Sequence, residues 1–196
     1  MTEVVPSEPP LCVDLDGTLI EGDTLRMSLG YLARRSPWTM LLAPFVLLRG
    51  RPAFKAWVAR RYVPDPARLA WRNEVIEFLR EERGRGRQII LATAAHRLVA
   101  ERVVAHLGLF DGVVATDAGT NIKGKHKTAH IRKSLGCNDF DYIGDSSADL
   151  PIFQAARVCY LVAPSRSLRD AAGGVGRVAR IFHGTDWRKK PPRQSG

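Results

Sequence analysis

The sequence predicts a doubly wound α/β fold, in which helices cover both faces of a parallel sheet. Short apolar runs recur along the chain, and segments of helical periodicity, about ten to fifteen residues long, separate them. Several of these runs end in Asp, Thr or Gly, residues typical of the loops where α/β proteins carry their functional groups. We therefore expect a Rossmann-like sheet built from right-handed crossovers.

The first predicted strand opens the segment LCVDLDGTLI, residues 11–20. It leads into Asp14 and Asp16, which lie two residues apart and therefore leave the same face of an extended segment. Both carboxylates should be ionised at neutral pH, since the ordinary pKa of Asp is about 3.9. Two like charges this close need a cation, and Mg²⁺ suits them because it prefers hard oxygen ligands. For this segment taken alone, a turn between two strands is the alternative.

The second predicted strand is QIILATAA, residues 88–95, which ends in Thr93 and Ala94. The threonine hydroxyl lies at the carboxyl end of this strand, just before a helix that we expect to begin near Ala95. The N-terminus of a helix offers backbone N–H groups to a phosphate. The helical pattern stops at Gly108, a residue typical of helix C-termini.

A third strand is predicted in FDYIGDSSADLPIF, residues 140–153, and it ends in Asp145 with Asp149 four residues later. Two shorter apolar runs, GVVAT at 112–116 and RVCYLV at 157–162, are predicted as further buried strands. Ligands of an open parallel sheet bind beyond the carboxyl ends of its strands. Acidic side chains from distant segments can therefore meet at this edge. A basic partner is offered by the stretch NIKGKHK, residues 121–127.

Taken in order, DLDGT, a threonine that ends a strand, a lysine and GDSSAD resemble the haloacid dehalogenase superfamily of phosphohydrolases. The likeness covers roughly residues 10–165. The local wording, including LATAAHRLVAERVVAHLGLFDGVVATDAGTNIKGKHK and GDSSADLPIF, is similar to the phosphatase-like domain that is fused to some membrane prenyltransferases of the ubiquinone-biosynthesis type. The transferase half is absent from this sequence.

The resemblance implies a role for each acidic residue. Asp14 would be the nucleophile that attacks phosphorus and forms an aspartyl-phosphate. Asp16 would protonate the leaving oxygen and then activate the water that cleaves the intermediate. The side chain of Asp14, the backbone carbonyl of Asp16 and the carboxylate of Asp145 would hold Mg²⁺. Asp149 would either join these ligands or orient the lysine or a bound water.

The resemblance also implies groups that bind the phosphoryl oxygens. The candidates are Gly17, Thr18, Thr93, Ala94, Lys123 and Lys127. For the lysine the resemblance favours Lys123, with Lys127 second. A solvated basic helix start is the alternative for Lys127, and it is the favoured interpretation of Lys125.

Composition changes sharply in residues 26–72, which hold ten Lys or Arg against one acid, or +9 of the net charge of +10. The same stretch carries seven of the fifteen aromatic residues and three of the four tryptophans. Asp23 is expected to cap a first helix through Ala33, and Asp65 with Pro66 a long helix that ends near Gly84.

The resemblance implies that this region is a small helical cap that closes over the active site and selects substrates. The expected division is a core at residues 10–22 and 73–185, a cap at residues 23–72, and flexible tails at residues 1–9 and 186–196.

An almost unbroken apolar run, WTMLLAPFVLL, fills residues 38–48 of the expected cap. Arginines flank it on both sides: Arg34, Arg35, Arg49 and Arg51. Eleven residues are too few to span a bilayer. The favoured interpretation is a buried helix kinked at Pro44. The alternative is an apolar surface with basic flanks that lies on a membrane or grips a lipid tail.

The basic excess calls for an anionic partner. A phosphorylated small molecule, a lipid phosphate or an anionic membrane surface would satisfy it, whereas nucleic acid is disfavoured because no nucleic-acid module is recognisable. Three scattered cysteines without metal-ligand spacing fit reduced thiols. We expect a cytoplasmic protein, at the membrane periphery if the apolar run meets lipid. The sequence does not predict the oligomeric state.

Two more residues are candidates for substrate contact. The resemblance implies substrate contact for Asp23, because related phosphatases have an acidic residue near this place that reaches the substrate, and a helix cap is the alternative. His96 follows the strand that ends at Thr93, and a solvent-exposed histidine at a helix start is the favoured alternative.

We predict a Mg²⁺-dependent phosphatase for a phosphomonoester, with the composition of the expected cap favouring an amphiphilic or prenylated phosphate. Dehalogenation is disfavoured, because Asp16 is the acid and base that a phosphate ester requires and a carbon–halogen substrate does not. The alternative from another class is a binding module that recruits a lipid phosphate or a membrane prenyltransferase, with little turnover.

Overall fold

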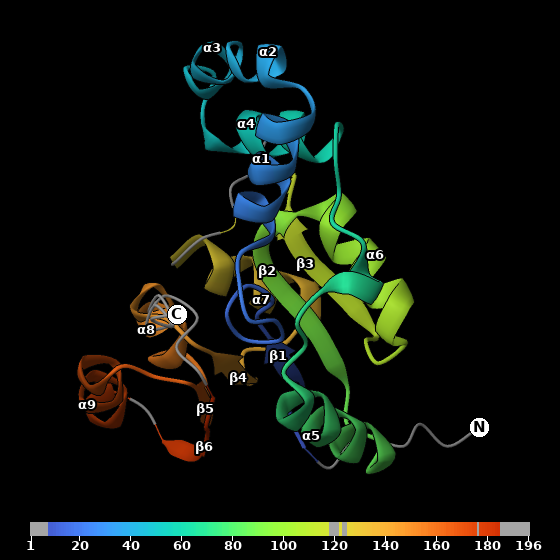
Figure 1. The fold of residues 1–196 in the computed structure, drawn as a ribbon. Helices are drawn as coiled ribbons and strands as arrows, with labels where there is room; N and C mark the ends of the chain where they lie inside the picture. The colour runs from blue at the N-terminus through green and yellow to red at the C-terminus, as the bar shows by residue number, and fades with distance from the viewer. Residues whose placement is uncertain (1–7, 118–121, 123–124, 176, 185–196) are drawn as a thin grey trace, which may run out of the picture.

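The computed structural model describes residues 8–117, 122, 125–175 and 177–184. A six-stranded sheet forms its centre, with all neighbours parallel and the order β3-β2-β1-β4-β5-β6 (Figure 1). The strands are β1 (Leu11–Val13), β2 (Ile89–His96), β3 (Gly112–Thr116), β4 (Asp141–Gly144), β5 (Cys159–Val162) and β6 (Val178–Phe182). This order, which starts at the centre and grows outward on both sides, is that of a doubly wound α/β sheet. The predicted fold class is confirmed.

Each face of the sheet has its own buried core, because successive residues of a strand point to opposite faces. In β1, Leu11 and Val13 belong to one apolar cluster, whereas Cys12 belongs to the other. The first face is covered by α5 (Asn73–Gly84) and α6 (Arg97–Leu107), and the second by α7 (Lys125–Leu135), α8 (Leu150–Phe153) and α9 (Arg166–Val175). With both faces covered, polar groups that follow the strands gather at the sheet edge.

Four inserted helices follow β1 and stand beyond the carboxyl ends of the strands (Figure 1). They are α1 (Thr24–Arg35), α2 (Pro37–Met40), α3 (Ala43–Leu47) and α4 (Arg51–Ala59). As predicted, Asp23 caps the first of them, and its carboxylate accepts a hydrogen bond from the Arg26 amide at 2.8 Å. The helices α1 and α4 lie against each other and contribute the buried side chains Leu32 and Val58.

The prediction of a long helix that begins at Asp65 is wrong. Asp65 caps only a short 3-10 helix, η1 (Pro66–Arg68), and α5 begins later, at Asn73. The backbone between them bonds with the loop that follows the first strand, where the Arg72 amide donates to the Leu19 carbonyl at 2.8 Å. These tertiary bonds replace the helical ones and fasten the end of the insertion to the sheet.

The favoured interpretation of residues 38–48 as a buried helix kinked at Pro44 is also wrong. Here α2 and α3 are separate short helices, and Pro44 lies in the first turn of α3, where its missing N–H costs little. Six large apolar side chains of this stretch are exposed and are called the apolar tip below: Trp38 (80%), Leu41 (63%), Leu42 (52%), Phe45 (68%), Leu47 (49%) and Leu48 (86%). The helices α1 and α4 supply the interior of the insertion, so burial of the tip is not needed to fill it.

The C-terminal region adds structure for which no element was predicted. The helix α9 packs on the sheet, and β6 extends the sheet beside β5. The expected tail at residues 186–196, and residues 1–7 of the expected tail at residues 1–9, lie outside the described residues. Among the described helices, none combines the length and the apolar character that a bilayer span requires.

Candidate active site

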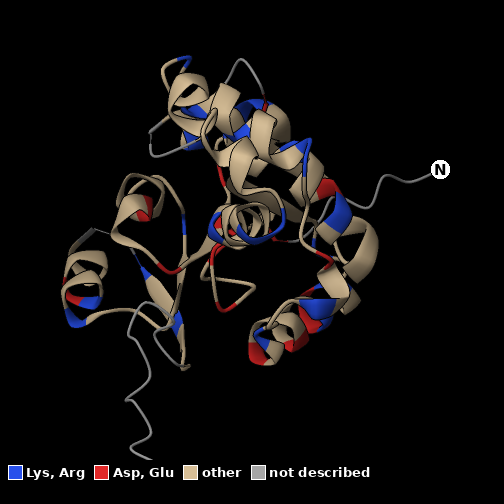
Figure 2. Cartoon of the chain, turned by 45° about the horizontal axis from the view of Figure 1, so that its top comes forward, with Lys and Arg blue, Asp and Glu red and all other residues tan. Residues whose placement is uncertain are grey.

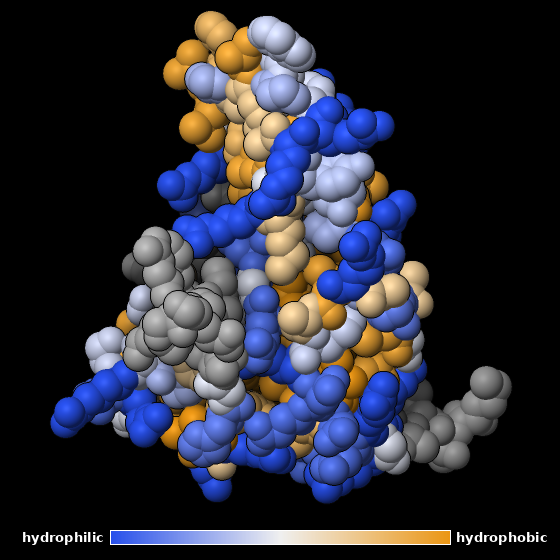
Figure 3. Space-filling view, in the orientation of Figure 1, coloured by the Kyte–Doolittle hydropathy of each residue, from blue (hydrophilic) through white to orange (hydrophobic). Residues whose placement is uncertain are grey.

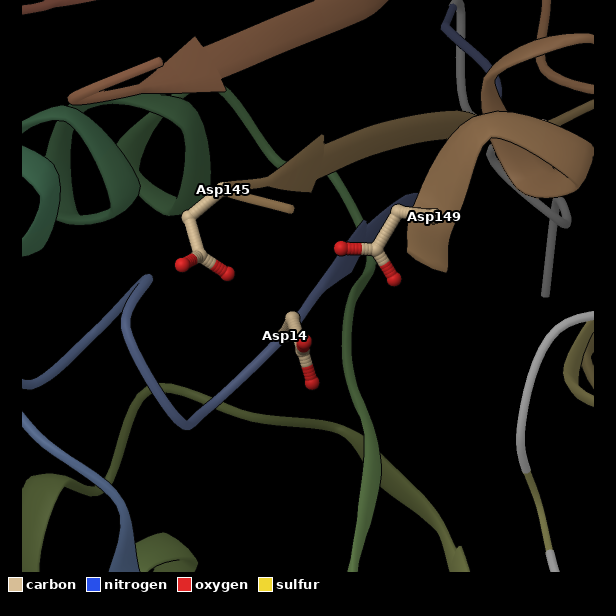
Figure 4. Close-up of side chains that lie close together, drawn as sticks. All are labelled: Asp14, Asp145 and Asp149. Atoms are coloured by element: carbon tan, nitrogen blue, oxygen red, sulfur yellow. The ribbon is translucent and has the colours of Figure 1, made fainter. Parts of the chain in front are cut away.

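Three carboxylates meet beyond the carboxyl ends of the two central strands, β1 and β4. Asp14 directly follows β1, Asp145 directly follows β4, and Asp149 ends a 3-10 turn, η2 (Ser147–Asp149), that leads into α8. One oxygen of each carboxylate lies within 4.8 Å of the other two. Figure 4 shows the three side chains close together beyond the strand ends. Negative charges this close raise one another's pKa values unless a cation compensates them.

One such cation is the ammonium of Lys127, which lies in the first turn of α7. Its Nζ lies 3.0 Å from Asp14 Oδ1 and 3.8 Å from Asp149 Oδ1. Burial lowers the pKa of Lys127, but the nearby carboxylates, Asp14 foremost, raise it by more, so the net pKa is raised. The side chain is therefore a buried ammonium held against the carboxylate predicted to be the nucleophile.

Lys123, the lysine favoured from the sequence, lies outside the described residues, as does the side chain of Lys125. Of the lysines in this stretch, the structure therefore describes only the placement of the Lys127 side chain. Which of Lys123 and Lys127 serves the reaction stays a prediction.

The phenol of Tyr142 connects two members of the site, and the sequence analysis did not single it out. Its hydroxyl accepts a hydrogen bond from Lys127 Nζ at 2.5 Å and donates one to Asp149 Oδ1 at 3.1 Å. The available signal was its position in β4, three residues before Asp145, as an aromatic side chain with a hydroxyl in a buried strand. Burial raises its pKa well above the ordinary value, which keeps the hydroxyl protonated as a donor.

The second oxygen of Asp149, Oδ2, is buried and has no hydrogen-bond partner among the described residues. An unsatisfied buried polar group costs about 1–3 kcal/mol, and more if it is charged. Burial raises the pKa of Asp149, and Lys127 opposes that rise. A divalent cation that prefers oxygen ligands would satisfy this atom and neutralise the cluster, so the residues present fit Mg²⁺ held by Asp14, Asp145 and Asp149.

Asp16 has a different environment, because its carboxylate turns toward the start of α1. It accepts hydrogen bonds from the Thr24 amide at 2.8 Å and from the Thr24 hydroxyl at 3.3 Å. Burial and then the Asp23 carboxylate raise its pKa to about 7. The Asp16 side chain does not belong to the cluster of three carboxylates. It is instead a carboxyl group that titrates near neutral pH. Its hydrogen bonds to Thr24 connect the loop after β1 to the inserted helices.

The predicted phosphate-binding residues fall into two groups. Gly17, at a φ of 83° that favours glycine, shapes the turn after Asp16, and Ala94 lines the cavity described below. The two threonine hydroxyls are buried and engaged within the protein: Thr18 Oγ1 donates to Asp145 Oδ1 at 3.2 Å, and Thr93 Oγ1 accepts from the Ala95 amide at 3.0 Å. The threonines therefore support the loops that carry the site.

Both predicted substrate-contact residues line the cavity and also cap helices. Asp23 caps α1, and His96 Nδ1 accepts a hydrogen bond from the Leu98 amide at 3.2 Å at the start of α6. Burial lowers the pKa of His96, which favours the neutral imidazole. For Asp23, capping a helix and lying on the cavity wall are thus compatible, and His96 caps α6 but is half-buried instead of solvent-exposed.

A cavity of about 780 Å³ lies between the sheet edge and the inserted helices. Asp14, Asp16 and Lys127 lie on its wall, together with residues of α1 and α4. The contributions of α4 were not predicted: Arg51, Phe54, Lys55, Val58 and Ala59 line it. Lys55 Nζ donates to the Ala94 carbonyl at 2.5 Å, which ties the inserted helices to the strand that ends near the site.

Comparison with known proteins gives a family and a set of folds. A family model described as haloacid dehalogenase-like hydrolase matches residues 11–154. A relative from Sinorhizobium fredii (strain NBRC 101917 / NGR234), named Uncharacterized protein y4nM, is 37% identical over 153 residues, or 78% of this chain. The match covers only 30% of that relative's length.

Two solved structures share the fold. A protein with unknown function from Bordetella pertussis Tohama I has a TM-score of 0.70 at 18% identity, covering 90% of this chain and 98% of that one. A phosphoserine phosphatase in apo form has a TM-score of 0.60 at 17% identity, covering 92% of this chain and 96% of that one. At these identities the likeness shows the architecture of the sheet and its helices.

Proposed function

This chain belongs to the haloacid dehalogenase-like hydrolases, and we propose that it is a Mg²⁺-dependent phosphatase that hydrolyses a phosphomonoester through an aspartyl-phosphate at Asp14. The observation that carries the proposal is the ammonium of Lys127, 3.0 Å from Asp14 Oδ1 inside a cluster of carboxylates. A carboxylate that attacks a phosphate must approach an anion. At an effective dielectric constant near 20, a cation at this distance offsets repulsion of about 5 kcal/mol.

The proposed reaction has two steps. In the first, an Asp14 oxygen bonds to phosphorus, the bond from phosphorus to the leaving oxygen breaks, and Asp16 gives its proton to that oxygen. In the second, water attacks phosphorus, Asp16 takes its proton, and the bond between phosphorus and Asp14 breaks. The pKa of about 7 supports this role for Asp16, because the group is present in both protonation states near neutral pH.

We propose that Asp14, Asp145 and Asp149 hold Mg²⁺, since their donor set and the unpartnered Asp149 Oδ2 fit it. When bound, Mg²⁺ supplies Lewis-acid polarisation of the phosphoryl oxygens. Thr18 holds the Asp145 carboxylate in place, and Tyr142 fixes Asp149 relative to Lys127.

We further propose that the inserted helices act as a cap that favours an amphiphilic or prenylated phosphate. The cavity wall combines apolar side chains, such as Phe54 and Val58, with the basic groups of Arg26 and Arg51. This lining would accept an apolar tail next to an anionic head group. The link to membrane prenyltransferases stays a prediction.

The test is phosphate release from a panel of sugar phosphates, phosphoserine, nucleotides and prenyl phosphates, with and without Mg²⁺. We expect release that requires both Mg²⁺ and Asp14, with Asp14→Asn inactive and the exposed control Asp139→Asn unaffected. Preference for prenyl phosphates would support the proposed substrate class, and equal turnover across the panel would count against it. Full activity of Asp14→Asn would overturn the mechanism. If no phosphate were released from any member of the panel, the result would favour the alternative function, a binding module with little turnover.

A further inference from the structure

The apolar tip is the main exposed apolar feature of the described residues. Of their eight exposed large apolar side chains, six belong to the tip. Figure 3 shows this gathering as orange atoms at the top of the view, where Figure 1 places α2 and α3. Soluble surfaces carry single exposed apolar residues without consequence, but a cluster of this kind marks an interaction site.

The charges around the tip are of one sign. Residues 24–64 contain eight Lys or Arg and no Asp or Glu. Arg34 and Arg35 precede the tip, Arg49 and Arg51 follow it, and all four are exposed. In Figure 2 blue segments interrupt the tan ribbon of these helices. The tip is therefore an apolar surface inside a basic rim.

We propose that the apolar tip docks on an anionic membrane surface, with its large side chains among the lipid chains and the arginines at the head groups. This combination of exposed Trp, Phe and Leu with basic flanks is what binds proteins at the interface of a bilayer. A second copy of this chain fits the tip less well, because two tips in contact would bring eight exposed arginines together without a carboxylate from residues 24–64 to compensate them.

The tip also continues into the active-site cavity. Leu47 belongs to the tip and lines the cavity, and Arg51 belongs to the basic rim and lines it as well. If the proposed function holds, docking would bring the cavity next to the lipid surface, from which an amphiphilic phosphate could enter. The docking itself does not depend on turnover.

The experiment measures co-sedimentation of the purified chain with vesicles of phosphatidylcholine alone and of phosphatidylcholine mixed equally with phosphatidylglycerol. We expect binding to the anionic vesicles that weakens with salt. The double variant Phe45→Ser/Leu48→Ser should bind at least about tenfold more weakly, because it removes two large exposed apolar groups. Neither residue lines the cavity. The matched control is Leu98→Ser, an exposed leucine of α6 at 40% exposure, which should bind like the wild type.

A charge variant tests the rim. Arg34→Glu/Arg35→Glu should weaken binding to the anionic vesicles by more than about tenfold, whereas Arg132→Glu/Lys133→Glu, on the exposed side of α7, should have little effect. Circular dichroism and urea unfolding verify that each variant is folded.

Quenching of tryptophan fluorescence by brominated lipids gives a second readout. It should be strong for the wild type and mostly lost in Trp38→Phe, since Trp38 is the tip's only tryptophan and is 80% exposed. The proposal would be overturned if the tip variants bound the anionic vesicles as strongly as the wild type. It would also be overturned if the wild type failed to bind anionic vesicles and formed a dimer that Phe45→Ser/Leu48→Ser dissociates. That result would make the tip an interface with a second copy of this chain. Phosphate release is measured separately, so loss of activity and loss of docking are distinguishable.

Discussion

Replacing Lys127 with Met removes the ammonium beside Asp14 while keeping an unbranched side chain of similar length. The side chain is 3% exposed, and its Nζ lies 3.0 Å from Asp14 Oδ1. At an effective dielectric constant near 20, that pair attracts by about 5 kcal/mol. This is an upper bound for the effect on the rate, because the attraction already exists before the substrate binds. The loss of one preorganised donor to a developing charge typically costs about 2.7–4 kcal/mol, or about a hundred- to a thousandfold in kcat.

The assay is Mg²⁺-dependent phosphate release at saturating substrate, with urea unfolding of each variant. Lys127→Met should lose activity by this factor. Its loss of stability should be larger in EDTA than in Mg²⁺, because without either cation the three carboxylates face one another uncompensated. Lys133→Met is the matched control, since Lys133 lies on the same helix and is exposed.

Lys123→Met separates the two lysine candidates. If Lys127 serves the reaction, Lys123→Met should keep most of its kcat. The reasoning would be refuted if folded Lys127→Met kept more than about a tenth of the wild-type kcat while Lys123→Met lost its activity.

Three further predictions concern stability and the metal. Arg87→Met should lower the free energy of unfolding by about 3–5 kcal/mol, since it removes the buried cation that pairs with two buried carboxylates, Glu82 and Asp141, and leaves Asp141 only the half-exposed Arg157; a change below about 1 kcal/mol in urea would contradict this. Gly144→Ala should reduce both stability and activity, because its Cβ would lie 2.7 Å from the Tyr142 ring and 3.0 Å from Asp149 Oδ2, and wild-type values for both would refute the packing argument. Mg²⁺ at about a hundred times its Kd for the wild type should stabilise the wild type by about 2.7 kcal/mol, measured as a rise in Tm. An equal rise in Asp149→Asn at the same Mg²⁺ concentration would exclude Asp149 as a ligand.

Five of the six strands could be predicted from the sequence, because they are largely buried and appear as short continuous apolar runs. The sixth, β6, has only one buried residue and was not predicted. The edge where Asp14 and Asp145 meet follows from that prediction, since parallel strands all end on one side. The helix α1 was predicted through its cap at Asp23, a local signal.

What failed depended on tertiary partners. The segment after Asp65 pairs with the loop near Leu19 instead of continuing as a helix, and no local pattern reports such a pairing. An apolar run such as residues 38–48 has the same composition whether it is buried or exposed, so its exposure depends on where α1 and α4 pack. The role of Tyr142 depends on which side chains surround it in space.

The central claim is that Asp14 carries the phosphoryl group. A direct test incubates Asp16→Asn with p-nitrophenyl phosphate and Mg²⁺, followed by acid quench and mass spectrometry of the peptides. This leaving group needs no proton from Asp16, so the first step proceeds while hydrolysis of the intermediate is slowed. The account predicts one phosphoryl group on the peptide that contains Asp14, absent from Asp14→Asn. A burst of nitrophenol with the phosphoryl group on another residue, or steady turnover with none on Asp14 at any quench time, would contradict it.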